Sequence, residues 1–304
     1  MFVTRYHAIA SWTGLVIATA ATTNIAAAQE IVAAPIVWDE AESPVDAETW
    51  TSANAQSLVQ RAPKPGEHTS FGTEVRVLVS RTHVYIRVEC ADPNPESAIA
   101  HAVVFDADQS YDDHVSVVLD TFGHHRTAYE FDVNTAGVRS DGLISPAAIM
   151  TDYDWNGDWR ATVHHRANGW TAFIAIDARS LRFPRDSKAW RMNVARYVPR
   201  DQLSLQWSGI SLDAAVTDLS RTGALSNLQS LQPATGWQFS PYVLARDSNI
   251  GHGAAQTGFD VRYGIGPEMT AVVTVNPDFA EAEVDARQIN LTPYELFQPE
   301  KRAF

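Results

Sequence analysis

The chain has 304 residues, of which 45% are hydrophobic, and its 36 acidic and 23 basic side chains give a formal net charge of −13. This acidic balance disfavours a nucleic-acid-binding protein, because such binding depends on clustered lysine and arginine. The length suits one large β core or two small ones. Cys90 is the single cysteine, which excludes an intrachain disulfide. It ends an apolar strand face and is predicted to be a buried small hydrophobe.

The N-terminus has the features of a secretory signal. Arg5 supplies a positive charge, residues 9–20 are apolar, and Ala26-Ala27-Ala28 provides a small-residue cleavage site before Gln29. Residues 1–28 are therefore predicted to be a signal peptide that exports the chain to the periplasm or outer membrane. No later apolar run reaches the length of a transmembrane helix.

Strand-like alternation dominates from Glu74 onward. Apolar residues recur at every second position in six segments, 74–80, 83–90, 115–119, 127–133, 170–176 and 190–194. Period-two runs separated by Gly, Pro, Asn and Asp predict antiparallel sheets packed as a jelly-roll-like β-sandwich, which we expect over residues 35–225. A short helix is expected at 46–53 and a single helical turn at 177–181. Three tryptophans lie on apolar faces and are assigned to the core, namely Trp50, Trp170 and Trp190.

A polar stretch at residues 226–236 ends in turn-forming residues and is predicted to be a domain boundary. Three more strand-like runs follow, at 237–246, 259–265 and 269–276. Their alternation suits a sheet with one apolar face or the wall of a membrane barrel. Because a barrel needs at least eight strands to close, residues 237–304 are expected to be only the truncated start of one, with the outer membrane as a possible partner.

The loop at residues 152–159 combines aromatic and polar side chains. Tyr153, Trp155 and Trp159 can present a flat ring to a sugar while neighbouring polar groups bind hydroxyls. We therefore interpret these three residues as candidate ligand contacts, and the family resemblance given below implies that the ligand is a carbohydrate. The alternative is that Trp155 or Trp159 caps one end of the sandwich core.

A second polar group follows the strand-like segment at 127–133. It is expected on the face opposite Tyr129 and Phe131, where its members could bind sugar hydroxyls or form the solvated outer face of a sheet. This group contains Glu130, Asp132, Asn134, Arg139 and Asp141, of which Glu130, Asn134 and Asp141 are candidate binding residues.

Four carboxylates fall within eight residues at Asp106, Asp108, Asp112 and Asp113. Hard oxygen ligands at this density suit Ca²⁺, although the spacing is not that of an EF-hand. A solvated acidic loop is the alternative. No other cofactor is expected, because the ten histidines show no spacing at which three or four could converge on zinc.

No catalytic motif is found. The chain lacks a Gly-x-Ser-x-Gly nucleophile turn, a phosphate-binding loop and a dinucleotide fingerprint. A pair of carboxylates for glycoside hydrolysis cannot be chosen among 36 acidic residues without geometry. Catalysis is therefore not expected.

The order of these strands resembles a carbohydrate-binding module-like domain of family 9, found at the front of large outer-membrane barrel proteins. The matching segments are Val45-Asp46-Ala47-Glu48-Thr49-Trp50, residues 74–78 and 84–90, Asp92-Pro93-Asn94-Pro95, Asp112-Asp113-His114-Val115, residues 119–122 and 131–137, Trp155, Trp159, residues 169–172 and Leu181-Arg182-Phe183. The run from Asn276-Pro277-Asp278-Phe279 to Pro299-Glu300-Lys301-Arg302 resembles the opening of the uncharacterised barrel domain that follows such modules.

The resemblance implies an exported bacterial β-sandwich that binds mono- or oligosaccharide and is linked to carbohydrate catabolism, without implying catalysis. The chain departs from the family at Phe173, where the family usually has Glu, and at Ile176-Asp177-Ala178, where it has Ile-Pro-Phe. Two other functions stay open. One is a periplasmic accessory domain of an outer-membrane barrel, acting in transport or assembly without sugar binding, and the other is a glycoside hydrolase.

Overall fold

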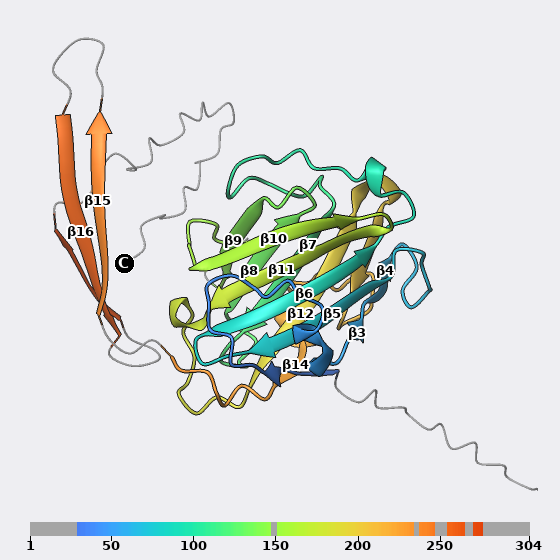
Figure 1. The fold of residues 1–304 in the computed structure, drawn as a ribbon, viewed down its shortest axis with the longest axis horizontal. Helices are drawn as coiled ribbons and strands as arrows, with labels where there is room; N and C mark the ends of the chain where they lie inside the picture. The colour runs from blue at the N-terminus through green and yellow to red at the C-terminus, as the bar shows by residue number, and fades with distance from the viewer. Residues whose placement is uncertain (1–28, 147–150, 234–236, 247–253, 265–269, 276–304) are drawn as a thin grey trace, which may run out of the picture.

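The computed structural model describes residues 29–146, 151–233, 237–246, 254–264 and 270–275. Two β-sheets lie face to face between residues 30 and 226, and a smaller third sheet follows them in the chain (Figure 1). The all-β sandwich predicted from the alternating segments is confirmed, and each of the six segments lies within a strand of these two sheets or extends beyond it by no more than one residue.

The sheet nearer the viewer in Figure 1 is called sheet B. Its main path runs β10-β11-β6-β5-β2, and β3 also pairs with β5. The strands are β10 (Trp159–Arg166), β11 (Gly169–Asp177), β6 (His83–Ala91), β5 (Thr73–Val79), β2 (Ala34–Pro35) and β3 (Gln56–Ser57). Gly169 begins β11 with φ of +140°, and a Cβ there would lie 2.0 Å from the Cys90 carbonyl oxygen, so only glycine fits.

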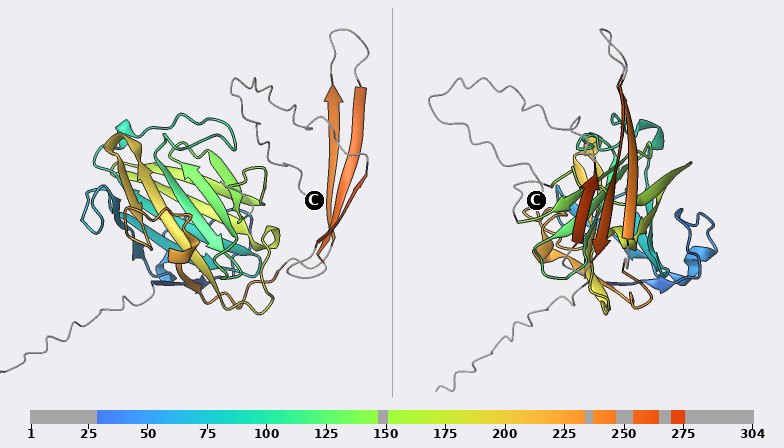
Figure 2. Two further views of the ribbon diagram at one scale, coloured as in Figure 1. Left: turned by 180° about the vertical axis from the view of Figure 1, so that it is seen from behind. Right: turned by 90° about the vertical axis from the view of Figure 1, so that its left-hand side faces the viewer.

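The opposite sheet, called sheet A, faces the viewer in the left panel of Figure 2. Its path runs β1-β14-β12-β7-β8-β9, while β13 pairs with both β12 and β4. The strands are β1 (Glu30–Val32), β14 (Gly223–Ser226), β12 (Ala189–Val198), β7 (His114–Asp120), β8 (Ala128–Asn134), β9 (Arg139–Ile144), β13 (Leu203–Gln206) and β4 (Val59–Ala62). The hairpins β7–β8 and β8–β9 make three strands that are consecutive in sequence neighbours in space.

The inner faces of the two sheets form one continuous apolar core. Its strand residues alternate as predicted, for example Val75 and Val77 on β5 and Val115 and Val117 on β7. Cys90 belongs to this core, and burial raises the pKa of its thiol to about 11. The assignments of Trp50, Trp170 and Trp190 to buried positions are confirmed, since each is at most 2% exposed.

The outer faces of both sheets are partly covered by apolar segments. On sheet B, Trp50 from the 3₁₀ turn η1 (Thr49–Ser52) packs with Tyr85 and Phe173. On sheet A, Leu219 from η5 (Leu219–Arg221) packs with Val118 and neighbouring residues. Elsewhere on this face of sheet A, the outward side chains of β7 and β8 are polar, among them Ser116, Glu130 and Asp132.

Helical structure is limited to short 3₁₀ turns among the described residues. The helix expected at 46–53 is reduced to η1, and the turn expected at 177–181 is η3 (Ala178–Ser180). The other two turns are η2 (Pro95–Ser97) and η4 (Pro199–Asp201). In the part of the chain that the structure describes, no helix has the length and apolar character needed to cross a bilayer.

The third sheet contains β15 (Trp237–Arg246), β16 (Ala254–Gly264) and β17 (Thr270–Val275). These strands form an antiparallel meander and pair only with one another, apart from the sandwich sheets (Figure 1). The three runs expected after the boundary at 226–236 are therefore strands. That they begin an outer-membrane barrel stays a prediction, because residues 276–304, which carry the resemblance, lie outside the described residues. The predicted signal peptide at residues 1–28 also lies outside them.

Candidate functional site

Outward side chains of β12, β7 and β8 form a polar surface on sheet A. Ser116 on β7 lies between Asp132 on β8 and Ala195 on β12. Two residues away on β7, His114 lies between Asn134 and Tyr197 of the same two strands. Cross-strand partners in an antiparallel pair share a face, so these side chains stand side by side. We call this surface the polar face and define it by His114, Ser116, Glu130, Asp132 and Tyr197.

Two carboxylates form the centre of the polar face. Glu130 and Asp132 are two residues apart on β8, so both point outward, with Cα atoms about 7 Å apart. They are only 6% and 8% exposed. Glu130 accepts hydrogen bonds from the Ser116 hydroxyl at 3.3 Å and the Thr151 hydroxyl at 2.8 Å. The Oδ1 atom of Asp132 is buried without a hydrogen-bond partner among the described residues.

No arginine, lysine or histidine within the described ranges forms an ion pair with Glu130 or Asp132. Burial and, to a smaller extent, the charge of the neighbouring Asp132 carboxylate together raise the pKa of Glu130 to about 7. Burial likewise raises the pKa of Asp132 to about 7. Removal from water disfavours the charged form, and two like charges on one strand face add to that cost. The pair therefore holds on to protons near neutral pH.

The loop that follows β9 brings Thr151 and Tyr153 onto this face. Gly142, the cross-strand partner of Glu130, has no side chain, and a Cβ there would lie 2.4 Å from Thr151 Cγ2 and 3.2 Å from Tyr153 Cδ1. Asp152 and Leu143 exchange two backbone hydrogen bonds, which hold this loop across β9 next to Gly142. Tyr153 keeps 43% of its surface exposed. Burial of its hydroxyl and the charges of Glu130 and Asp132 raise its pKa.

His114 and Tyr197 form one end of the polar face. Their rings stack at 4.6 Å with an interplanar angle of 20°. Nδ1 of His114 lies 2.8 Å from the Asp112 carbonyl oxygen, and because a carbonyl only accepts, Nδ1 carries the proton. Burial lowers the pKa of His114, so the ring is neutral and Nε2 is an acceptor. Burial, with the charges of Asp132 and Glu130, raises the pKa of Tyr197 to about 12.

Asn134, a predicted carbohydrate contact, has its hydrogen-bonding groups used within the protein. Its amide nitrogen donates to Asp112 at 2.8 Å and to the Ala102 carbonyl at 3.2 Å. Its oxygen accepts from the backbone N–H groups of Ala136 and Val138. Asn134 is fully buried and holds the loop around Asp112 against the end of β8. The structure therefore gives it a supporting position beneath the polar face.

The predicted placement of Asp141 on the same face as Glu130 is wrong. Asp141 is the cross-strand partner of Phe131 and therefore shares the inner face, as does Arg139, the partner of Val133. The Asp141 carboxylate accepts from the Gly157 N–H at 2.7 Å, so it anchors the loop at residues 152–159. Alternation continued across the β8–β9 turn would have placed Asp141 with Phe131, because odd-numbered residues face inward on both strands; the prediction grouped the polar residues without applying it.

The two tryptophans of that loop lie against the core, away from the exposed ring of Tyr153. Trp155 is half-buried and contacts Tyr129 at 4.7 Å between ring centroids. Trp159 is 4% exposed and packs edge-on against Phe131 at 5.1 Å. The structure thus brings Tyr153 together with Glu130. It places Trp155 and Trp159 against one end of the core, which agrees with the alternative interpretation of these two residues.

The four carboxylates proposed for Ca²⁺ are not brought together. Asp112 accepts four hydrogen bonds, two from His101 and one each from Ala102 and Asn134, while Asp113 faces the Ile99 N–H and Arg200. Asp108 accepts from the Ser110 N–H, and Asp106 from the Asp141 N–H. Among the described residues no three His, Cys, Asp or Glu side chains gather to hold a metal ion. The chain turns these carboxylates toward separate backbone donors.

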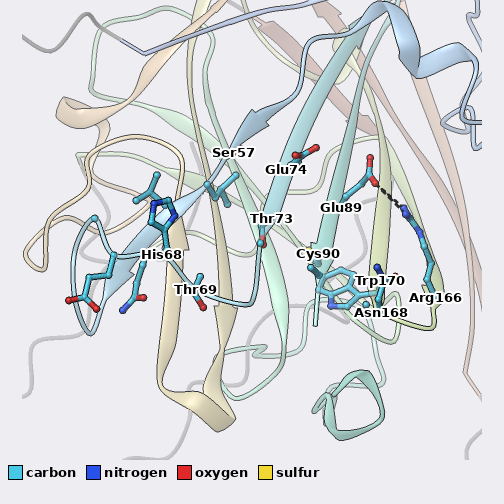
Figure 3. A pocket seen from close by; sticks show the side chains of 18 residues that line it. Ser57, His68, Thr69, Thr73, Glu74, Glu89, Cys90, Arg166, Asn168 and Trp170 are labelled. Carbon is cyan, nitrogen blue, oxygen red and sulfur yellow. Dashed lines mark hydrogen bonds and ion pairs between the residues drawn. The ribbon is translucent and has the colours of Figure 1, made fainter. Parts of the chain in front are cut away.

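Two cavities lie elsewhere on the sandwich. The larger, of about 620 Å³, opens between the β4–β5 loop and the ends of β6 and β11, with Trp170 at its base (Figure 3). Among the charged residues that line it, Glu89 and Arg166 form an ion pair at 3.3 Å. None of the predicted contacts lines it. The smaller, of about 520 Å³, is bordered by Trp159, Phe105 and Arg139, whose guanidinium lies between the two rings.

The two departures from the resemblance have structural explanations. Phe173 is 4% exposed and packs against Trp50 on the outer face of sheet B. Asp177 accepts from the Arg179 N–H and thereby starts η3. Neither position lies on sheet A, so neither bears on the polar face.

Comparison with known proteins supports the fold. A solved structure from Bacteroides uniformis ATCC 8492, described as a candidate carbohydrate-binding protein, has a TM-score of 0.53 at 14% identity, covering 66% of this chain and 99% of that one. A family 9 carbohydrate-binding module from Caldicellulosiruptor kristjanssonii in complex with cellotriose has a TM-score of 0.46 at 12% identity, covering 68% of this chain and 95% of that one. Residues 233–304 match a family model described as a domain of unknown function, DUF5916. None of the curated proteins matches significantly.

Several residues of the polar face were not singled out from the sequence as binding residues. Ser116 and His114 alternate with the apolar positions of β7, so their outward direction was readable. Tyr197 lies on β12 beyond the predicted segment 190–194, and Thr151 reaches the face only through the loop crossing at Gly142. Tyr111, which is 73% exposed just before Asp112, is a further ring at this end of sheet A.

Proposed function

We propose that the protein is an exported carbohydrate-binding protein that takes a mono- or oligosaccharide on the polar face of sheet A. The observation that carries the proposal is the juxtaposition of the exposed Tyr153 ring with Glu130 and Asp132, one of whose carboxylate oxygens has no partner within the described residues. A sugar needs a flat apolar surface for its C–H groups and fixed acceptors for its hydroxyls. Buried polar atoms without partners gain most from such a hydrogen bond.

The fold and the sequence support the same proposal. The solved structure with a TM-score of 0.53 carries a description as a candidate carbohydrate-binding protein. Residues 1–28 have the pattern of a signal peptide. We therefore place the protein in the periplasm or at the outer membrane, with a role in carbohydrate catabolism. Recovery of a chain beginning at Gln29 from the exported fraction would support the export part, and recovery of the uncleaved chain inside the cell would contradict it.

Titration calorimetry tests sugar binding. We expect heat on titration of the mature chain with glucose, cellobiose or xylo-oligosaccharides. Tyr153→Ala should weaken that binding about fivefold to tenfold, since a ring contact contributes on the order of 1 kcal/mol. The matched control is Tyr263→Ala, which removes a ring of similar exposure, 39%, from the third sheet. Equal losses in both variants, or no binding of any of these sugars, would contradict the proposal.

A second candidate function, glycoside hydrolysis, is favoured by the carboxyl pair itself. Glu130 and Asp132 share one face at a separation within reach of the 5–10 Å that paired glycosidase carboxyls show, and one group with a raised pKa can act as an acid. Release of reducing sugar from a polysaccharide panel, lost in Glu130→Gln, would favour the enzyme over the binding protein.

A further inference from the structure

The carboxyl pair of the polar face has an uncompensated charge. The ionisable groups that face it are His114 from β7, Tyr197 from β12 and Tyr153 from the loop, while Asp108 and Asp141 add negative charge nearby. His114 is neutral because burial lowers its pKa. No side chain in this set is a permanent cation.

Arg61 on β4 is a cation whose charge acts on Tyr197, but its guanidinium donates to other groups. Its guanidinium donates to the Ser204 hydroxyl at 3.1 Å and to the carbonyl oxygens of Leu212 and Ala214 at 3.1 and 2.8 Å. It forms no ion pair with Glu130 or Asp132. Compensation for the pair must therefore come either from protons or from a ligand.

The polar face is also dominated by acceptors. Both carboxylates accept, Asp132 Oδ1 has no donor within the described residues, and Nε2 of His114 is an acceptor because Nδ1 carries the ring proton. The hydroxyls of Ser116 and Thr151 already donate to Glu130. A sugar hydroxyl would satisfy one of these acceptors, but it supplies no charge.

We propose that the polar face selects a sugar that bears a protonated primary amine, with its ammonium group against Glu130 and Asp132. This inference rests on the proposed carbohydrate-binding function and specifies its ligand class. An ammonium group has three donors and no acceptor, which matches a surface rich in acceptors. Its hydrogen bonds to carboxylates are charge-assisted and stronger than those of a neutral hydroxyl. The Tyr153 ring remains available to the sugar body.

The test compares three disaccharides of similar shape by calorimetry at pH 7, namely the β-1,4-linked dimer of glucosamine, its N-acetylated form and cellobiose. We expect the amine-bearing dimer to bind about tenfold more tightly than the other two, the factor that one charge-assisted hydrogen bond supplies. Asp132→Asn and Glu130→Gln should abolish the preference. Asp154→Asn, which removes an exposed carboxylate from the same loop, should keep it. Thermal unfolding of each variant checks that it is folded.

The preference should also disappear at pH 5, where protons take the place of the ammonium group. Equal binding of all three disaccharides, unchanged in folded Asp132→Asn, would overturn the amine inference and leave sugar binding standing. Binding of the glucosamine dimer alone would support the inference and limit the proposed function to amino sugars. Failure of all three to bind would overturn both. A loss of preference in Asp154→Asn as large as in Asp132→Asn would show that only the general negative field attracts the amine.

Discussion

Two pairs of buried acidic residues in the sandwich differ in how their charge is balanced. Asp92 and Asp113, both fully buried, lie with Arg196 and Arg200, whereas Glu130 and Asp132 on the polar face have no cationic partner within the described residues. One pair belongs to a network of ion pairs between the two sheets, and the other lies beneath the outer surface of sheet A with no such network among the described residues.

The network of ion pairs is built from several strands. Arg200 reaches Asp92 at 2.6 Å and Asp113 at 3.5 Å, and Arg196 reaches Asp92 at 3.7 Å. Arg196 also donates to the Ala91 carbonyl at 2.7 Å, and its guanidinium lies over the Phe71 ring at 5.6 Å. One oxygen of Asp113 still lacks a partner within the described residues. Even so, the arginines offset the charge, which the polar face cannot do by itself.

The contrast separates a structural role from a binding role. A buried carboxylate that is paired with arginine holds elements together and costs much when the pair is broken. A buried carboxylate with no cation lowers stability, and retaining two of them on one face makes sense where a ligand interacts with them. Each of the following experiments alters one side of this contrast.

The largest effect is expected from Arg196→Met. This change removes a fully buried cation and leaves Asp92 and Asp113 with only Arg200. Breaking a buried ion pair by removing one partner costs about 3–5 kcal/mol. Urea unfolding measures the loss, and Arg81→Met, at a side chain that is 74% exposed, is the control with little expected change. A loss below about 1 kcal/mol in Arg196→Met would show that the network does not contribute as its burial suggests.

On the polar face, removing the charged groups is expected to raise the free energy of unfolding instead of lowering it. Because the folded-state pKa values of Glu130 and Asp132 are raised to about 7, the folded state binds more protons than the unfolded chain between about pH 4.5 and 7. The pair therefore makes the protein less stable as pH rises through this window. The double variant Glu130→Gln, Asp132→Asn should be more stable than the natural chain at pH 8, and this difference should almost vanish at pH 4.

Taking the difference between the two proteins cancels the titration of every other group, as long as both unfold in two states. Urea unfolding at pH 4, 6 and 8 supplies the six values required. A double variant that is less stable than the natural chain at pH 8 would mean that the carboxylates are paired in solution, and the contrast with the Asp92–Asp113 network would then be wrong.

A smaller effect on stability should distinguish Trp155 from Tyr153 in the loop at residues 152–159. Trp155→Ala should destabilise by about 1–2 kcal/mol, below the range for fully buried tryptophans, because the ring is half-buried against Tyr129. Tyr153→Ala should change stability little and act on ligand binding. Thermal unfolding and calorimetry of both variants check this division. If Trp155→Ala weakened binding while keeping full stability, the ring would be a ligand contact as the sequence first indicated.

The sequence was sufficient for the strands and insufficient for the site. Alternation identified β5–β8, β11 and β12, because each buries one face and period two is then unavoidable. It missed β4, β13 and β14, which have four residues each, too few for a period to be visible, and it also missed the longer strands β9 and β10. For the site, alternation gave Glu130 and Asp132 an outward position, and Asp141 was misplaced because the alternation was not continued across the β8–β9 turn. The crossing of Thr151 over Gly142 is a tertiary contact that no local pattern records.

The smallest effect is expected from Ca²⁺. Asp106, Asp108, Asp112 and Asp113 lie close in sequence, but each carboxylate accepts from a different backbone N–H, and Asp112 already accepts four hydrogen bonds. An ion bound at these residues would stabilise the folded state by about 2 kcal/mol at an excess of about thirtyfold over its dissociation constant, which would raise the Tm by about 4–8 °C. After treatment with a chelator, we expect added Ca²⁺ to change the Tm by less than about 1 °C, well below the shift that a bound ion would cause. Mg²⁺ serves as the matched control for ionic strength. A larger shift with Ca²⁺ alone, abolished by Asp108→Asn, would mean that the acidic loop rearranges around the ion and that its carboxylates belong with the ligand-dependent side of the comparison.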